Sequence, residues 1–264
     1  MKNILRRNAV NILGNGEETI LFLHGFGCDQ SVWKHIVPAF IEDYKIVLLD
    51  FVGAGKSDIS AYDKFRYSKL EGYAQDVLEV CTELQLKNII LVGHSVSCMI
   101  GALAAINDSS VFKKLIFVGP SPRYLNDVGY NGGFEKVDLD LLFELMDEDY
   151  IAWSNSTAAA IMANRERPEL SEELSNSFCL LEPEIAKDFA KVTFLSDNRK
   201  DLPYIPVESL TLQCQEDILA PLEIGHYINM NTKGNTLVIL EATGHCPHLS
   251  APEETILAIR SYLS

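Results

Sequence analysis

The chain has 264 residues, of which 47% are hydrophobic, and its formal net charge is −15. A chain of this length can bury one large core, and α/β folds of this size commonly form a single unit. The negative charge repels phosphate backbones and anionic lipid surfaces, so we expect no nucleic-acid partner and no membrane partner. The sequence has no apolar run of the roughly 18 residues that a membrane span needs. Its basic N-terminal residues are not followed by the apolar segment of a signal peptide, so we expect a cytoplasmic protein.

Short apolar runs alternate along the chain with helical patterns. The runs cover residues 19–23, 45–49, 88–92, 114–118, 209–214 and 236–240. They are continuous rather than alternating, which is typical of strands covered on both faces. Helical patterns follow at 70–86 and 96–106, and a last helix begins near Pro252. Repeated strand–helix units predict an α/β fold with a mainly parallel sheet and helices on both faces.

This alternation stops between residues 122 and 202. The pattern there predicts several helices, over 138–146, 149–163, 171–178 and 182–195, which Pro168 and Pro183 help to separate. The segment is too long for a structureless connection in a compact domain. We therefore expect a core formed by residues 1–121 and 203–264, and an inserted helical cap formed by residues 122–202 above the carboxyl edge of the sheet.

One serine stands at the junction of the third strand and the helix that follows it. The stretch Gly93-His94-Ser95-Val96-Ser97 matches the nucleophile pattern G-x-S-x-G, except that Ser97 replaces the final glycine. In this pattern a sharp strand-to-helix turn exposes the serine hydroxyl, and small neighbours leave room for it. Ser95 is the candidate nucleophile, and the alternative is a serine in an ordinary strand–helix turn.

A serine hydroxyl needs a base within hydrogen-bonding reach, and the base needs an acid that orients it. In this pattern the acid and then the histidine follow in chain order, each after a strand. Asp217 follows the fifth apolar run and His245 follows the sixth, which makes them the candidate acid and base. Glu216 is the alternative acid, and His248 is the alternative base.

The third requirement is a pair of backbone N–H donors that bind the oxyanion of an acyl-transfer intermediate. One donor is expected from Val96, the residue after the nucleophile, and the other from the loop after the first strand. That loop is His24-Gly25-Phe26-Gly27, so Phe26 is the expected second donor. The stretch 53–57 resembles a phosphate loop, but Asp50 occupies the position of its first glycine. No second cluster accompanies His245 and His248 as metal ligands, so we expect no metal and no cofactor.

Large side chains of the inserted segment predict an apolar pocket above Ser95. They are Tyr124, Phe134, Trp153 and Phe194. A mostly apolar cavity with a few polar groups suits a small hydrophobic ester or lactone. The alternative is that these side chains form the internal core of the cap.

These motifs together resemble the α/β-hydrolase superfamily along nearly the whole chain. The stretches 24–33, 93–97, 121–127 and 132–135 resemble one small branch of it, which holds the bacterial stress-response regulator RsbQ and the plant karrikin and strigolactone receptors. The stretches 119–122 and 244–248 favour the RsbQ side of that branch. The resemblance implies a triad of Ser95, Asp217 and His245 beneath a V-shaped lid of four helices.

The resemblance also implies a ligand site and a role in signalling. The positions that match the pocket of the plant receptors are Phe26, Tyr124, Phe134, Leu142, Trp153 and Phe194. Thr157 departs from the plant pattern, in which an aromatic residue is common. The bacterial members work with a PAS-domain PP2C-type phosphatase that activates a stress sigma-factor pathway. We therefore expect a monomeric serine hydrolase with a regulatory role in stress signalling. The alternative is a ligand sensor with slow hydrolysis whose output is binding of the phosphatase.

Overall fold

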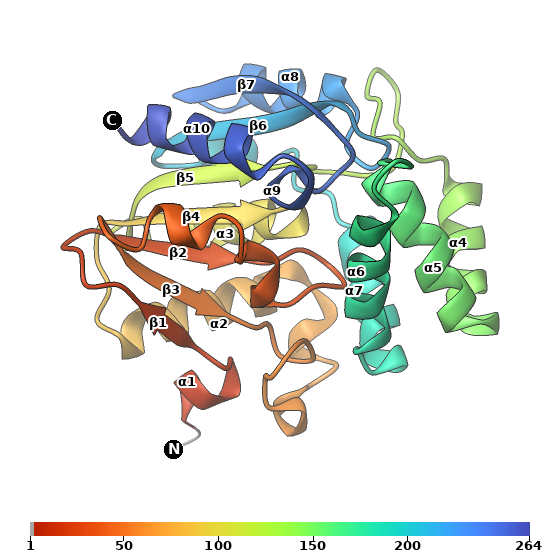
Figure 1. Ribbon diagram of the computed structural model, residues 1–264, viewed down its shortest axis with the longest axis horizontal. Coiled ribbons are helices and arrows are strands. Elements are labelled where there is room, and N and C mark those ends of the chain that lie inside the picture. The colour runs from red at the N-terminus through yellow and green to blue at the C-terminus, as the bar shows by residue number, and fades with distance from the viewer. Residues whose placement is uncertain (1–2) are drawn as a thin grey trace.

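The computed structural model describes residues 3–264, which are built around one twisted sheet (Figure 1). The strands of this part of the chain are β1 (Asn11–Leu13), β2 (Thr19–Leu23), β3 (Lys45–Leu49), β4 (Ile89–His94), β5 (Phe112–Val118), β6 (Glu208–Glu216) and β7 (Asn235–Thr243). Their order in the sheet is β1-β3-β2-β4-β5-β6-β7. Only β1 runs antiparallel to its neighbour, and the other pairs are parallel. The sheet confirms the predicted fold class.

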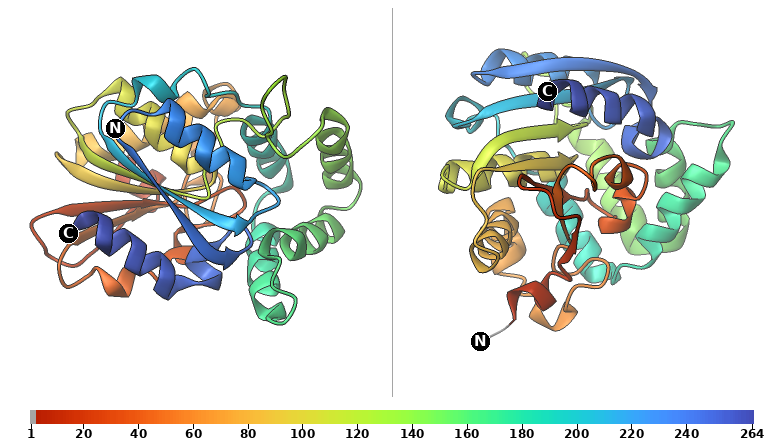
Figure 2. Two further views of the ribbon diagram at one scale, coloured as in Figure 1. Left: turned by 90° about the horizontal axis from the view of Figure 1, so that it is seen from above. Right: turned by 60° about the vertical axis from the view of Figure 1, so that its left-hand side comes forward.

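Helices cover both faces of this sheet and one of its ends. They are α1 (Ile4–Arg7), α2 (Leu70–Glu83), α3 (Val96–Asn107), α4 (Lys136–Glu148), α5 (Tyr150–Met162), α6 (Pro168–Cys179), α7 (Pro183–Phe194), α8 (Leu222–Asn231), α9 (Pro247–Ser250) and α10 (Pro252–Leu263). Short 3-10 helices, including Gln30–Trp33, lie in the connections. Figure 2 shows the sheet between its two layers of helices.

The two faces of the sheet form separate apolar cores, because successive side chains of a strand point to opposite sides. On β2, Leu21 and Leu23 join the cluster that contains Val77 of α2. Ile20 and Phe22 join the cluster on the other face, which contains Ile259 of α10. Every residue of β2 is therefore buried, as its continuous apolar run predicts.

The helices α4–α7 come between β5 and β6, where the sequence predicts helices. Asp149 caps the start of α5 by accepting a hydrogen bond from the amide of Ala152, and Pro168 and Pro183 open α6 and α7. Figure 1 shows that these helices lie at the end of the sheet toward which the parallel strands point. This end is where ligands bind in open parallel sheets.

The short elements β1, α1 and α9 are not predicted from the sequence, and the sequence does not delimit α8. The strand β1 has three residues, and the side chain of Ile12 is 41% exposed, so no buried apolar run marks it. The helices α1 and α9 have four residues each, too few to show a helical period. In α8, Gly225 lies within the helix, although glycine disfavours helix interiors.

Candidate active site

Ser95 lies in a strained turn between β4 and α3. Its backbone has φ +57° and ψ −125°, outside the regions that non-glycine residues ordinarily adopt. The turn is held by hydrogen bonds from the amide of Ser95 to the carbonyl of Val118 and from the amide of Cys98 to the carbonyl of Ser95. A Cβ atom at Gly93 would lie 2.7 Å from the carbonyl oxygen of Ser97, so this turn requires glycine before the serine. Such local strain is typical of functional sites.

Ser97, which replaces the last glycine of the nucleophile pattern, has a structural role of its own. Its side chain is fully buried, and its hydroxyl donates a hydrogen bond to the carbonyl of His24. The bond joins the turn around Ser95 to the loop after β2. A serine at this position is therefore compatible with the sharp turn and adds a link to the neighbouring loop.

Ser95, His245 and Asp217 form one buried chain of hydrogen bonds. The Nε2 atom of His245 lies 2.8 Å from Oγ of Ser95, and its Nδ1 atom lies 2.7 Å from Oδ2 of Asp217. The other carboxylate oxygen of Asp217 accepts hydrogen bonds from the amides of Leu219 and Ala220, at 2.8 Å and 3.1 Å. These amides and the imidazole together fix the carboxylate. With Nδ1 donating to Asp217, a neutral His245 presents Nε2 as the acceptor for the proton of Ser95.

The two alternative residues lie elsewhere. Glu216 is exposed at the end of β6, and the structure brings its backbone carbonyl, rather than its carboxylate, into contact with the loop of His245. His248 is fully buried between the rings of Trp33 and His94, with centroid distances of 4.7 Å and 4.3 Å. Burial, with a smaller contribution from His245, lowers the pKa of His248 to about 3. The ring of His248 is therefore a neutral part of the packing.

His94 supports the loop that carries His245. Its Nε2 atom donates a hydrogen bond of 2.9 Å to the backbone carbonyl of His245. Burial, followed by the proximity of His248, lowers the pKa of His94 well below its usual value, so this ring is also neutral. The sequence places His94 next to Ser95, and the structure shows that it contacts the backbone of the facing loop.

The loop of residues 24–27 lies against the turn of Ser95. A Cβ atom at Gly25 would lie 3.3 Å from Cβ of Ser95, which shows how closely the two segments approach. Phe26 is partly exposed, and its side chain lines the cavity above Ser95. Val96 is the first residue of α3, where backbone amides have no partner within the helix. The loop and the helix start thus lie on either side of Ser95, where an oxyanion-binding pair of amides is expected.

A narrow cavity separates Ser95 from the inserted helices. It is lined by Phe26, Cys28, His94, Ser95, Tyr124, Trp153, Thr157, Ile161, Leu174, Phe178, Thr193, Phe194, Leu219, His245 and Cys246. The space open to the centre of a water-sized sphere is about 20 Å³, room for about one or two waters. A larger open groove of about 960 Å³ lies between the N-terminal segment and residues 29–41, but none of the three hydrogen-bonded residues lines it.

Two of the side chains expected in the pocket lie outside this lining. Phe134 packs against Phe194, with ring centroids 5.8 Å apart. Tyr124, which lines the cavity, also packs against Phe194, with ring centroids 5.1 Å apart. Phe134 therefore belongs to a second layer behind Phe194. Leu142 of α4 is partly buried among the core side chains and also does not line the cavity. Neither side chain is among the residues that line the cavity in this structure.

Several of the residues that line the cavity are not predicted from the sequence, including Ile161, Leu174, Phe178, Thr193 and Leu219. Phe178 is a clear case, because Gly27 makes its position possible. A Cβ atom at Gly27 would overlap the ring of Phe178, and Gly27 has φ +78°. A glycine at position 27 indicates that another group packs closely against the backbone there, but the sequence does not show which side chain it is.

Two thiols that line the cavity, those of Cys28 and Cys246, stay protonated because burial raises the pKa of both. Burial raises the pKa of the Cys28 thiol to about 12.

Among residues 3–264, no group of three or more His, Cys, Asp or Glu side chains is arranged to hold a metal ion. The same part of the chain contains no helix that is both long enough and apolar enough to cross a membrane.

The fold and the hydrogen-bonded residues at the carboxyl end of the sheet define a class of protein. The family model described as the Alpha/beta hydrolase family matches residues 20–258, so this chain belongs to that family.

Similar proteins narrow the class. The chain is 42% identical over 248 residues to the Karrikin insensitive 2 receptor CA of Petunia hybrida, covering 94% of this chain and 92% of the relative. It is 36% identical to the Strigolactone esterase D14 of Arabidopsis thaliana, covering 99% and 98%. Among solved structures, the hydrolase olei00960 from Oleispira antarctica superposes with a TM-score of 0.97 at 39% identity, covering 99% and 96%. The protein is thus an esterase-like α/β hydrolase related to karrikin and strigolactone receptors.

Proposed function

We propose that this protein hydrolyses a small hydrophobic ester or lactone, with Ser95 as nucleophile, His245 as general base and Asp217 as the acid that orients it. The observation that carries this proposal is the buried chain of hydrogen bonds from Ser95 through His245 to Asp217. Its position beneath the inserted helices, in a chain whose relatives include esterases, supports the same reaction class.

The reaction follows from the direction of these hydrogen bonds. Ser95 Oγ attacks the ester carbonyl while its proton moves to Nε2 of His245, and the carboxylate of Asp217 stabilises the imidazolium. The amides of Phe26 and Val96 bind the oxyanion. His245 then returns the proton to the departing alcohol, which leaves an acyl group on Ser95. A water molecule, deprotonated by His245, releases the acid and restores the serine.

The narrow cavity implies that ligand entry requires movement of the inserted segment. Typical ligand pockets have about 300–1,000 Å³, whereas the cavity above Ser95 is far smaller. We propose that residues 122–202 act as a cap that opens relative to the core formed by residues 1–121 and 203–264. The side chains of Tyr124, Trp153, Thr157 and Phe194 would contact the ligand, and Phe134 and Leu142 would support them from behind.

The test is rapid-quench hydrolysis of a small chromogenic ester by the wild-type protein and by Ser95→Ala, with intact-mass spectra of the quenched protein. The expected result is turnover by the wild type and its loss in Ser95→Ala. Ser261→Ala is the matched control, since Ser261 is exposed on α10 and does not line the cavity. Unchanged ester turnover in Ser95→Ala would contradict the proposal.

A second candidate function is ligand sensing, which the receptor relatives favour. In this proposal a monomeric, RsbQ-like protein hydrolyses its ligand slowly, and occupancy of the cavity changes the outer surface of the cap. The output would be binding of a PAS-domain PP2C-type phosphatase in stress signalling. The variant Thr157→Trp fills the cavity, so it should alter capture of such a phosphatase in a binding assay. Equal capture by the wild type and Thr157→Trp would argue against control by the cavity.

A further inference from the structure

Ser95 has a second polar partner besides His245. The phenolic oxygen of Tyr124 lies 3.2 Å from Oγ of Ser95. Tyr124 is only 1% exposed, and its ring packs edge-on against Phe194 at a centroid distance of 5.1 Å. Within the described residues, this hydroxyl thus points at the reacting oxygen from the loop between β5 and α4.

The direction of this hydrogen bond follows from the neighbouring bonds. The Nδ1–H group of His245 donates to Asp217, so Nε2 is an acceptor and takes the single proton of Ser95. The oxygen of Ser95 then has only lone pairs to offer to a further partner. Tyr124 is therefore the donor. Burial raises the pKa of Tyr124 above its ordinary value of 10.0, so the phenol keeps its proton at neutral pH.

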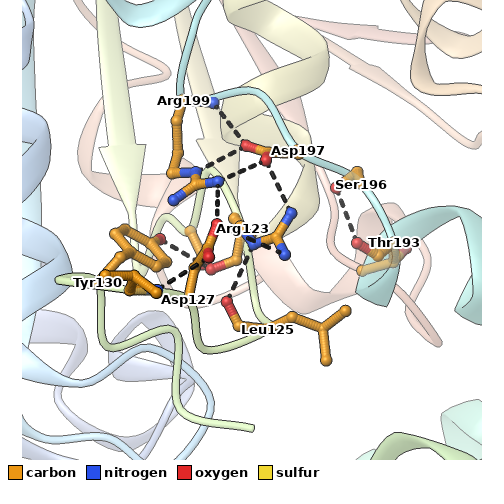
Figure 3. Close-up of polar contacts among 10 residues, drawn as sticks. Arg123, Leu125, Asp127, Tyr130, Thr193, Ser196, Asp197 and Arg199 are labelled. Carbon is orange, nitrogen blue, oxygen red and sulfur yellow. Dashed lines mark hydrogen bonds and ion pairs between the residues drawn. The ribbon is translucent and has the colours of Figure 1, made fainter. Parts of the chain in front are cut away.

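The loop that carries Tyr124 is tied down by a cluster of ion pairs, which consists of Arg123, Asp127, Asp197 and Arg199 (Figure 3). Nη1 of Arg123 lies 2.7 Å from Oδ2 of Asp197. Nη2 of Arg199 lies 2.8 Å from carboxylate oxygens of both Asp127 and Asp197. The cluster joins the segment that leaves β5 to the segment that returns toward β6. It therefore joins the two segments through which the chain enters and leaves the inserted helices, and it holds the loop of Tyr124 between them.

Two backbone contacts add to this attachment. The amide of Asn198 donates a 2.7 Å hydrogen bond to the carbonyl of Pro122, and the amide of Phe134 donates a 3.1 Å bond to the carbonyl of Tyr124. Tyr130, in the same loop, donates its hydroxyl to the carbonyl of Arg123 at 2.8 Å, and the guanidinium of Arg199 lies over its ring at 4.8 Å. The position of the Tyr124 hydroxyl is thus determined by many contacts rather than by its own side chain alone.

We propose that Tyr124 is a catalytic hydrogen-bond donor to Oγ of Ser95 that chiefly accelerates release of the acyl group, and that the ion-pair cluster positions it. The inference rests on the hydrolase function proposed above. During release, water attacks the acyl carbon and gives a proton to Nε2 of His245. The bond from the acyl carbon to Oγ then breaks, and its electron pair stays on Oγ. His245 returns the proton to Oγ, while Tyr124 keeps its own proton throughout.

The two half-reactions depend on this donor to different degrees. During acylation, Oγ of Ser95 is the nucleophile, so a donor that eases its deprotonation also withdraws electron density from the attacking lone pair. These effects oppose each other. During deacylation, Oγ is the leaving group, and a donor stabilises the negative charge that develops on it. Loss of the Tyr124 hydroxyl should therefore slow deacylation more than acylation.

The test compares wild type, Tyr124→Phe and Tyr204→Phe in rapid-quench assays of a chromogenic ester. The burst phase measures acylation, the steady phase measures deacylation, and intact-mass spectra measure the acyl adduct. In Tyr124→Phe we expect deacylation to slow about tenfold, the change in rate that one hydrogen bond of this strength supports, with acylation within about threefold of wild type. The acyl adduct should accumulate. Tyr204→Phe removes a hydroxyl from a side chain that is 71% exposed and lies outside the loop of Tyr124, so its ratio of the two rates should match wild type.

The positioning role of the cluster is tested by Asp197→Asn, alone and combined with Tyr124→Phe. Asp197→Asn weakens the contacts of Arg123 and Arg199, and should lower the ratio of deacylation to acylation about threefold. In the Tyr124→Phe background it should leave that ratio unchanged, because the donor that it positions is already absent. A merely structural role would slow both steps in both backgrounds.

The outcomes separate this inference from the hydrolase proposal. If wild type forms no acyl adduct and shows no turnover that depends on Ser95, the hydrolase proposal fails and the inference fails with it. If wild type acylates at Ser95 and Tyr124→Phe leaves the ratio of rates unchanged, only the role of Tyr124 is overturned. An equal slowing of both steps in Tyr124→Phe would also overturn it, since that pattern indicates displacement of the loop.

Discussion

In the proposed mechanism, replacement of Asp217 by asparagine should stop His245 from acting as the base while leaving the shape of the site intact. Oδ1 of Asp217 accepts two amide hydrogens, from Leu219 and Ala220, and Oδ2 accepts from His245. Asparagine has only one acceptor oxygen, and the two amides hold it at the Oδ1 position. Its NH₂ group must then face Nδ1 of His245, where the wild type has an acceptor.

This change reverses the tautomer of His245. A donor opposite Nδ1 requires Nδ1 to be unprotonated, so the ring proton moves to Nε2, the atom that faces Ser95 at 2.8 Å. His245 then cannot accept the serine proton. We expect kcat to fall roughly 10³- to 10⁴-fold, the size of effect that a wrong histidine tautomer causes in serine hydrolases. At 1.36 kcal/mol for each factor of ten, this corresponds to about 4–5 kcal/mol of transition-state stabilisation.

The assay is steady-state hydrolysis of a chromogenic ester by Asp217→Asn, with circular dichroism and thermal unfolding to verify the fold. Glu216→Gln is the matched control, because it makes the same chemical change one residue earlier on an exposed side chain. Its activity should equal that of the wild type. The reasoning is refuted if a folded Asp217→Asn variant keeps more than a tenth of wild-type activity, or if Glu216→Gln loses as much.

Three further predictions concern stability and the cavity. Burial lowers the pKa of His248 from 6.5 to about 3, so the unfolded chain binds a proton between these values that the folded chain does not. The stability that comes from keeping His248 neutral is complete above pH 6.5 and is lost as the pH falls below that value. His248→Phe should therefore reduce the slope of unfolding free energy against pH, between pH 6 and 4.5, by about 1.4 kcal/mol per pH unit. An unchanged slope in urea titrations would contradict this prediction. Ser97→Gly restores the usual motif glycine, yet it should destabilise the fold by about 2 kcal/mol, because it removes the bond to His24 and places glycine in a helix; a more stable variant in chemical unfolding would show the reasoning to be wrong. Thr157→Trp should fill the cavity and lower kcat/KM for a small ester at least about tenfold. Overpacking should also reduce the free energy of unfolding by about 1–3 kcal/mol. Unimpaired kcat/KM would mean that the ligand binds elsewhere.

The sequence alone determined the framework of the protein. Six apolar runs predict six of the strands. Burial on both faces explains the continuous runs of β2, β3, β4, β5 and β6, whereas β7 lies at the edge of the sheet and is only partly buried. Prolines and an absence of strand patterns predict the helices between β5 and β6. The nucleophile pattern locates Ser95 in its turn, because the small residues that a sharp turn needs are encoded locally.

Only the tertiary structure decided between neighbouring alternatives. Glu216 is the last residue of β6 and Asp217 is the next residue, but Glu216 is exposed, and only the carboxylate of Asp217 contacts His245. His245 and His248 are three residues apart, and packing against Trp33 removes His248 from the site.

The contacts between the site and segments that are distant in the sequence were likewise decided only by the tertiary structure. Tyr124 reaches Ser95, and Phe178 reaches Gly27, across long stretches of chain. Local patterns report whether a residue is buried and where the backbone turns, which the short-range periodicity of the chain encodes. The distance between two buried side chains depends on how whole loops and helices pack, and no short stretch of sequence carries that information.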